Sequence, residues 1–279
     1  MTTNGKFMAN PSLTMPAMRA QVPLFNFAYH HEGWLKEIHD VLKDEPWGKT
    51  LKPLELFVRS NFEIAKEQGK VFEDDSRGIA VWRPGYSVNA VSDPIFLVYK
   101  KNHVKGRQKW AFDRVHTGHC PVETNGVGLN VSYNPPEFNS EWKIFISQQA
   151  VENIMRANHG RLREVFGEKL ASNEHLIFRV IYAEIHLKQK EANVIPQWYR
   201  GEYQFLMPLS LSDPSKVELT ATLQPNPSLK QYDVRTLLYP HYAYSYARSV
   251  VRSYTSFVDW LKLDNSGLSE EIIEEESDD

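Results

Sequence analysis

The chain lacks three features that usually point directly to a class of protein. It holds one cysteine, Cys120, among 279 residues, so no disulfide can form within the chain, which is typical of a reducing compartment. No apolar run approaches the length of about 20 residues that a membrane-spanning helix needs. The sequence also contains no paired zinc ligands at suitable spacing, no glycine-rich phosphate loop and no nucleophile elbow. No reaction therefore follows from a motif.

A strong excess of positive charge is missing as well. The formal net charge is -3, and seven carboxylates lie between Glu270 and Asp279, so the rest of the chain carries +4 (-3 plus 7). This balance disfavours a dedicated binder of duplex DNA, which is usually strongly basic. We expect residues 264–279 to form a disordered acidic tail. The alternative is an acidic lid that competes with nucleic acid for a basic groove.

The N-terminal segment has no apolar core of the kind that a signal peptide requires. We therefore expect a flexible arm over residues 1–21 and a cytoplasmic protein that is not bound to a membrane. The oligomeric state is open.

The spacing of apolar residues predicts an α+β fold, with helices packed on one face of antiparallel sheet in a single body over residues 22–263. Helical spacing indicates helices over about 32–44, from Pro53 to Gly69, from Glu141 onward and from Glu174 to Ala192. Strand-like runs bounded by turn residues cover 78–82, 94–100, 109–115, 203–211, 217–223 and 231–239. Pro208 favours an edge position or a bulge, Pro240 begins a last helix, and no internal sequence repeat is visible.

An irregular stretch over residues 116–140 includes the cluster His116, His119 and Cys120. A loop of this length is often functional or disordered. A zinc site would need a fourth ligand and usually a second ligand pair, and neither is present at suitable spacing. A Cys–His nucleophilic pair would need a spatial contact that sequence does not show. We favour incidental histidines in a loop, and we expect neither metal nor cofactor.

Two predicted helices carry stripes of basic and aromatic side chains. Arg179, His186 and Lys190 fall on one face of the helix that begins at Glu174, with Tyr182 beside them. The last helix carries the second stripe, formed by His241, Tyr244, Arg248 and Arg252. Two such stripes flanking one sheet would form a groove for phosphates and bases. The alternative is that each stripe is an ordinary solvated helix face.

The stretch from Ile195 to Trp260 is the most strongly patterned part of the chain. It begins with IPQWYRGEYQFLMPLSL, in which Gln197 and Tyr199 lie near the start of a strand, and continues to the helix-like PHYAYSYARSVVRS. Tyr244 and Arg248 are one helical turn apart, so both could face one site beside Gln197. They could equally form a buried pair that fixes the last helix on the sheet.

This stretch resembles the C-terminal half of the bacterial family known as domain of unknown function 3825. The matching residues are Pro196, Gln197, Tyr199, Gly201, Gln204, Pro208, Tyr244, Ala247, Arg248 and Trp260. LFNFAY and the AVW-x-PG strand end resemble the N-terminal half more loosely, and the whole resemblance covers about residues 22–263. Arg83–Pro84–Gly85 stands where the family tends to have Asn-Thr-Gly, which leaves any role of that asparagine in doubt. The resemblance implies an RNA or DNA context by analogy.

Three functions are compatible with these observations. We expect a protein that binds nucleic acid, RNA before DNA, or a nucleotide through the basic and aromatic residues named above. The first alternative is an enzyme acting on phosphodiesters or nucleotides, in which arginine stabilises developing charge and tyrosine or histidine transfers a proton. The second is a non-catalytic structural or partner-binding protein.

Overall fold

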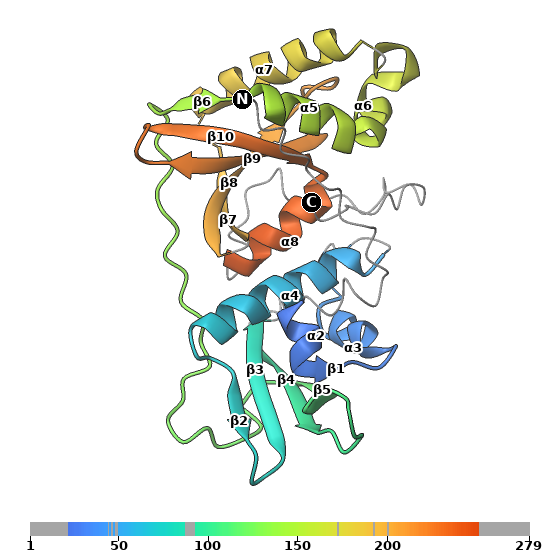
Figure 1. The fold of residues 1–279 in the computed structure, drawn as a ribbon, viewed down its shortest axis with the longest axis vertical. Coiled ribbons are helices and arrows are strands. Elements are labelled where there is room, and N and C mark those ends of the chain that lie inside the picture. Colours follow the sequence, from blue (N-terminus) through green and yellow to red (C-terminus); the bar gives the residue numbers. More distant parts are fainter. Residues whose placement is uncertain are drawn as a thin grey trace, which may run out of the picture.

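The protein folds into two sheets and seven helices over the residues that the computed structural model describes, which confirms the α+β class. The described residues are 22–43, 45, 47, 50–86, 93–171, 173–191, 193–199 and 201–250. The expected arm at residues 1–21, the acidic tail and the end of the body at residue 263 lie outside them. In Figure 1 the elements form stacked layers along the long axis of the molecule.

The first unit, residues 23–117, contains one five-stranded sheet, here called sheet A. Its elements are α2 (Pro23–Phe27), β1 (Ala28–Tyr29), α3 (Trp34–Val41), α4 (Lys52–Glu67), β2 (Phe72–Asp74), β3 (Ile79–Tyr86), β4 (Pro94–Lys101) and β5 (Trp110–Thr117). The strand order is β1-β5-β4-β3-β2, and only the pair of β1 with β5 is parallel. The predicted antiparallel meander is confirmed, and the parallel edge strand was not foreseen.

The second unit, residues 143–238, contains sheet B. Its elements are β6 (Lys143–Phe145), α5 (Gln148–Ala157), α6 (His159–Ala171), α7 (Glu174–Glu191), β7 (Ile195–Tyr199), β8 (Glu202–Leu209), β9 (Leu219–Asn226) and β10 (Gln231–Leu238). The strand order is β6-β10-β9-β8-β7, again with one parallel pair, β6 with β10. A final helix, α8 (Pro240–Val250), follows this unit.

The two units share one topology. In each, a short strand is followed by helices, α3 and α4 in the first unit and α5, α6 and α7 in the second. A four-stranded meander then returns so that its last strand pairs parallel with the short one. Sequence comparison within the chain shows no repeat, so the repetition lies in the strand connections alone. In Figure 1 the units stack in the order sheet A, α4, α8, sheet B and then the layer of α5, α6 and α7.

Helix α4 forms as its sequence predicts. Pro53 occupies the first turn, where its missing N–H costs no hydrogen bond, and residues at helical spacing such as Leu54, Phe57 and Phe62 are buried. The chain leaves the helix through Gly69, whose φ of 64° lies in the left-handed region that glycine adopts without strain.

The two central helices join the units. A single hydrophobic cluster extends from sheet A through α4 and α8 to sheet B, where it includes Ile195, Leu206 and Leu238. A second cluster fills the space between the opposite face of sheet B and helices α5, α6 and α7. The α8 helix therefore lies between two packed surfaces, which decides how much of its polar stripe can meet a ligand.

Two local expectations have different outcomes. The helix expected from Glu141 does not begin there, because Lys143–Phe145 pairs with β10 as a strand and the first helix starts at Gln148. Pro208 lies in β8 beyond the last residue paired with β7, which is Leu206, so this part of the strand has a neighbour on one side only. That position requires no N–H from proline on its open side, as the edge prediction implies.

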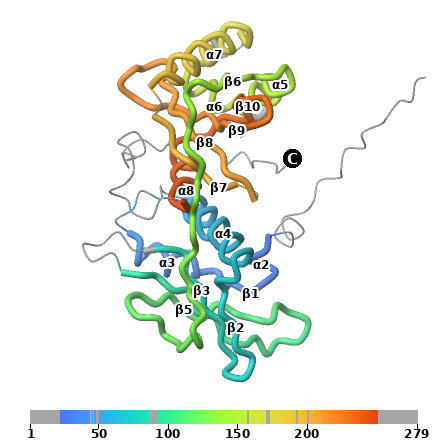
Figure 2. Tube along the Cα trace, turned by 90° about the vertical axis from the view of Figure 1, so that its left-hand side faces the viewer, coloured from blue at the N-terminus to red at the C-terminus, as the bar shows by residue number. Residues whose placement is uncertain are grey.

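A segment without regular helix or strand connects the units over residues 118–142. Figure 2 shows it running along one side of the molecule from the end of sheet A to the start of sheet B. Leu129 packs on the face of sheet A that is turned away from α4. Within the described residues, no helix is both long and apolar enough to cross a membrane.

Candidate nucleic-acid interface

The stripe predicted on α7 lies on the surface of the second unit. Arg179 and Lys190 are exposed, and His186 is half-buried with its ring centroid 4.2 Å from that of Tyr182, which is 44% exposed. The Nε2 atom of His186 is buried without a hydrogen-bond partner among the described residues. This face of α7 is exposed to solvent, but no second described surface faces it, so it does not form a groove.

The stripes on α7 and α8 lie on opposite faces of sheet B, so the predicted groove between them does not form. Phe205 and Met207 of β8 point into the cluster with α7, whereas Leu206 between them points into the cluster with α8. Successive side chains of a strand alternate between faces, and the sheet therefore separates the two helices.

The stripe on α8 is buried instead of lining a groove. Tyr244 is fully buried and Arg248 is 2% exposed. The Tyr244 hydroxyl donates to Oε2 of Glu45 at 2.7 Å, and Arg248 donates from Nε and Nη2 to the same carboxylate at 2.8 and 3.1 Å. Arg252, the fourth predicted member, lies outside the described residues.

Glu45, Tyr244 and Arg248 form a buried clasp between the first unit and α8. Burial lowers the pKa of the Arg248 guanidinium, but the Glu45 carboxylate and Tyr244 together raise it above its ordinary value, so the side chain stays charged. The guanidinium also lies over the Phe57 ring, 5.5 Å from its centroid. These contacts favour the structural alternative for the tyrosine–arginine pair, and they place both residues out of reach of a polymer.

Gln197 and Tyr199 also pack beneath α8. Gln197 is 1% exposed and donates from Nε2 to Gln204, which donates in turn to Gln224, so three amides form a ladder across β7, β8 and β9. The ring of Tyr199 meets that of Tyr246 edge to face, with centroids 5.5 Å apart. Tyr199 therefore serves the packing of α8 on sheet B, and Gln197 links neighbouring strands of that sheet.

His241 lies in the first turn of α8, in a half-buried aromatic setting. Its ring stacks with Tyr239, whose hydroxyl donates to Glu164 at 2.6 Å, and the buried guanidinium of Arg161 lies over the Tyr239 ring. Burial, and then the positive charge of Arg161, lower the pKa of His241 to about 4. At neutral pH the imidazole is uncharged, so it adds no cation to a phosphate site.

This environment predicts a loss of stability in acid that depends on His241. A folded-state pKa below the ordinary value of 6.5 means that His241 takes up a proton in the unfolded chain at a higher pH than in the folded one. The free energy of unfolding therefore keeps the full contribution of neutral His241 above pH 6.5 and loses it as the pH falls to 4. The loss amounts to roughly 3 kcal/mol. Urea titrations between pH 4 and 7 should show a shallower loss for His241→Gln than for the unchanged chain, and parallel curves would contradict the assignment.

The histidine–cysteine cluster stays a loop feature. His116 is the last residue but one of β5 and is half-buried, and His119 and Cys120 are exposed in the connecting segment. Among the described residues, no group of three or more His, Cys, Asp or Glu side chains is arranged to hold a metal ion.

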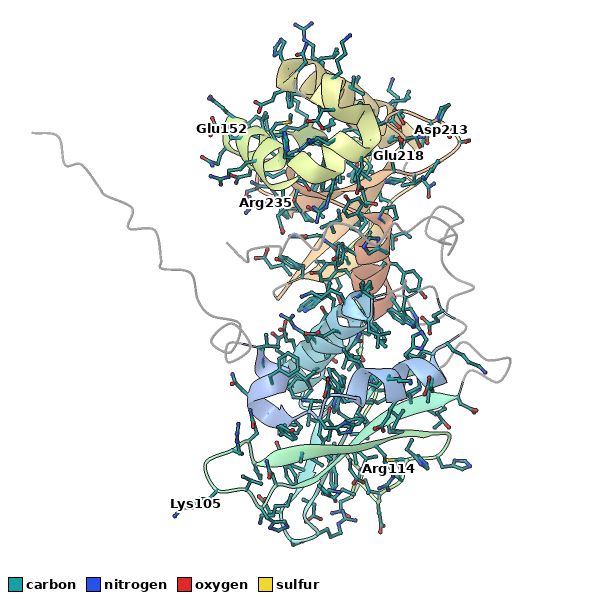
Figure 3. The ribbon with its side chains drawn as sticks, turned by 90° about the vertical axis from the view of Figure 1, so that its right-hand side faces the viewer. Lys105, Arg114, Glu152, Asp213, Glu218 and Arg235 are labelled. Atoms are coloured by element: carbon teal, nitrogen blue, oxygen red, sulfur yellow. The ribbon has the colours of Figure 1, made fainter. Side chains whose placement is uncertain are left out.

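A basic hairpin, which the sequence reasoning missed, carries a high density of positive charge. The segment from Pro94 to Thr117 forms β4, a loop and β5, and it carries six Lys or Arg residues and one Asp, a net charge of +5 (6 minus 1). Within the described part of the chain, Lys101, Lys105 and Arg107 are exposed and form no ion pair. Figure 3 shows Lys105 projecting from the sheet A end of the molecule.

The hairpin loop is held by its own hydrogen bonds. The amide of Asn102 donates to the carbonyl of Lys109 at 2.8 Å, and the Asn102 side chain accepts from the amide of Val104 at 3.0 Å. Gly106 turns the chain with a φ of 79°. Val104 is 62% exposed at the tip. The cations are thus presented by a short, structured loop on a buried sheet.

An exposed aromatic residue lies in one row with Lys100, a further cation of the hairpin. Tyr29 of β1 is 47% exposed and opposes Ala111, which in turn opposes Lys100, so the three form one row across neighbouring strands. Arg114 lies on the same face and shares the carboxylate of Asp113 with Lys100. We call the set the hairpin surface: Tyr29, Lys100, Lys101, Lys105, Arg107 and Arg114.

Acidic neighbours compensate only part of this surface. Lys100 donates to Asp113 at 2.8 Å and, as the strongest influence, lowers the pKa of that carboxyl. Lys109 is bound by Asp75 and Glu73, whose hydrogen bonds raise its pKa. Exposed pairs of this kind are weak, so the local potential stays positive.

Comparison with known proteins identifies a family that the chain matches. Residues 30–257, about four fifths of the chain, match the family described as Domain of unknown function (DUF3825). No curated protein and no solved structure matches the chain significantly.

Proposed function

Since the chain belongs to the DUF3825 family, as its sequence motifs suggest, and the description of that family assigns no activity, we propose a function from the protein's own surface. The protein binds the phosphate backbone of a nucleic acid strand through the hairpin surface. RNA is the first ligand to test, in keeping with the expectation from sequence.

The observation that carries this proposal is the group of exposed cations at Lys101, Lys105 and Arg107. Each cation that meets a phosphate releases a counterion, which is the main source of affinity in binding without base specificity. Tyr29 adds an exposed ring on which a base can stack, a contact that is tolerant of sequence. The near-neutral whole chain agrees with a local contact of a few phosphates better than with the long footprint of a duplex-binding protein.

The proposal predicts weaker binding when the hairpin cations are removed. The triple variant Lys101→Gln/Lys105→Gln/Arg107→Gln should lose about 10- to 100-fold in affinity for a labelled 20-nucleotide single-stranded RNA at low salt. The slope of log affinity against log salt should become shallower by about 2, because three phosphate contacts at about 0.7 each are lost. Fluorescence anisotropy across a salt series measures both quantities.

A matched triple variant on the second unit separates the hairpin from the other basic face. Arg179→Gln/Lys190→Gln/Lys230→Gln removes the same charge from exposed positions, two of which belong to the α7 stripe. We expect it to bind within about twofold of the unchanged protein. An equal loss in both triple variants would indicate a general charge effect. Loss only in the second would assign binding to α7 and refute the hairpin surface.

A further inference from the structure

The outer face of α7 carries a row of apolar side chains that the proposed function does not use. Leu176, Val180, Ala183 and Leu187 follow one another at steps of four, three and four residues, so they form one line along the helix. Leu187 is 59% exposed and Leu176 is 43% exposed. Of the eight large hydrophobic side chains exposed in the described part of the chain, three belong to α7, so such exposure is concentrated on this helix.

This row is the second apolar face of the helix. The first face, formed by Ile177, Ile181 and Ile185, is buried against sheet B. Figures 1 and 2 show α7 in the outermost layer of the molecule. A helix that is apolar on two sides is normally covered on both, and a row of exposed apolar side chains is typical of an interaction site.

The exposed charge beside the row is positive. Arg179 and Lys190 border it on one side, and neither forms an ion pair within the described residues. On the other side, half-buried Glu184 accepts from the backbone amide after β8 at 3.1 Å, and Glu191 pairs with Lys188 at 3.0 Å. A segment that covers this face should therefore be both apolar and negatively charged.

The end of the chain has this composition. Residues 268–279, here called the C-terminal segment, have the sequence LSEEIIEEESDD and lie outside the described residues. The segment contains three apolar side chains, Leu268, Ile272 and Ile273, together with seven carboxylates and no base. We propose that the C-terminal segment binds the outer face of α7 in the same chain, with its apolar side chains on the row and its carboxylates beside the two cations.

The chain is long enough for this contact. Leu268 follows the last described residue, Val250, by 18 residues, which span up to about 60 Å when extended. Helices α8 and α7 pack on opposite faces of sheet B, and packed layers lie about 10 Å apart, so the two helices are roughly 20 Å apart. The link can therefore pass around the edge of the sheet. A link of this length also keeps the segment at an effective concentration on the order of 1 mM.

A second copy of the chain suits this face less well. When two identical helices pack antiparallel about a two-fold axis, each flank of the contact meets the same flank of the partner. The flank with Arg179 and Lys190 would then face its own positive charges. The C-terminal segment supplies opposite charge and apolar side chains together, so it is the better occupant.

Zero-length cross-linking tests the contact on the unchanged full-length chain. A carbodiimide joins an amine only to a carboxylate that touches it, and about 0.15 M salt screens attraction between distant exposed charges. We expect Lys190 to form products with residues 270–279, in at least about ten times the yield of Lys230, which is exposed on the same unit. Mass spectrometry of a mixture of isotope-labelled and unlabelled protein should show that these products join residues of one chain.

Substitutions on each side of the contact separate apolar docking from attraction between charges. Leu176→Gln/Leu187→Gln alters two exposed side chains, so far-ultraviolet circular dichroism should stay unchanged. Ile272→Ser/Ile273→Ser keeps all seven carboxylates. Each double variant should lower the yield of Lys190 products about tenfold, because apolar burial is lost. Leu229→Gln is the control, because that leucine is 63% exposed in the turn between β9 and β10 and should leave the yield unchanged.

A fluorescent peptide with the sequence of the C-terminal segment tests whether the face is occupied. It should bind Ile272→Ser/Ile273→Ser at least about ten times more tightly than the unchanged chain, whose own segment competes for the face. Equal affinity for both proteins, or no binding to either, would refute the proposal. RNA binding does not enter this measurement, so the result is independent of the hairpin surface.

The distribution of cross-links decides against the proposal in three cases. Yields at Lys190 that Leu176→Gln/Leu187→Gln leaves unchanged would reduce the contact to attraction between charges. Products at Lys101 and Lys105 in place of Lys190 would put the segment on the hairpin surface, as an acidic lid over the cations proposed to bind RNA. Products that join two chains would assign the outer face of α7 to a second copy.

Discussion

Replacement of Arg248 by methionine is expected to lower the free energy of unfolding by about 3 to 5 kcal/mol. The side chain is 2% exposed, and its partner Glu45 is 3% exposed. Removing the cation leaves a buried carboxylate whose only remaining partner in the clasp is the Tyr244 hydroxyl. The loss of stability comes more from the uncompensated charge of Glu45 than from the lost attraction between Glu45 and Arg248. Removing the charge of Arg248 alone should therefore destabilise the protein more than removing both charges.

A double-mutant cycle tests this origin. Glu45→Gln keeps an acceptor for Tyr244 without the charge, so the double variant Glu45→Gln/Arg248→Met should be more stable than Arg248→Met alone by about 1 to 3 kcal/mol. Arg163→Met is the control, because its partner Glu168 is exposed and such pairs contribute less than about 1 kcal/mol. Urea unfolding measures all four variants. A loss at Arg248 no larger than at Arg163 would show that the clasp is open in solution.

Phe57→Ala is expected to cost about 3 to 5 kcal/mol for a different reason. The ring is 1% exposed, packs against Trp47 with centroids 5.1 Å apart, and supports the guanidinium of Arg248. Its removal leaves a cavity at the junction of the units, where α4, α8 and the end of β3 meet and little can move to fill it.

The matched control for Phe57 is Phe145→Ala on β6, where the same ring is 50% exposed. We expect that variant to lose less than about 1 kcal/mol. Because Phe57 belongs to the cluster that couples the two units, unfolding of Phe57→Ala should also separate into two transitions when it is followed by both tryptophan fluorescence and far-ultraviolet circular dichroism. Coincident transitions with a small loss would contradict the central role of this ring.

Most of the fold follows from local sequence pattern. Alternating apolar residues and turn signals placed β3, β4, β5, β8, β9 and β10, because each of these strands is bounded by Gly, Pro, Asp or Asn residues. Helices α4 and α7 were predicted to within a few residues by apolar spacing. The short strands β1, β2 and β6 were not predicted, because a strand of two or three residues is too short to show a periodic pattern of apolar residues.

The candidate site could be predicted only in part. The pattern on α8 showed that Tyr244 and Arg248 share a face, but burial of that face depends on Glu45, which is 203 residues from Arg248. Helical spacing carries no information about such a partner. The hairpin cations were visible as a run from Lys100 to Lys109 with no acidic residue, and they were overlooked because the net charge of the whole chain is near zero. A charge count in short windows would have found them.

The clasp also has a consequence for how the protein is made. A ribosome that adds about 5 to 20 residues per second needs roughly 10 to 40 s to pass from Glu45 to Arg248. Sheet A is complete once Thr117 has emerged, yet the side of α4 that packs against α8 has no cover until the last helix is synthesised. The newborn first unit therefore exposes an apolar helix face during this interval, and that face is where a chaperone would be most useful.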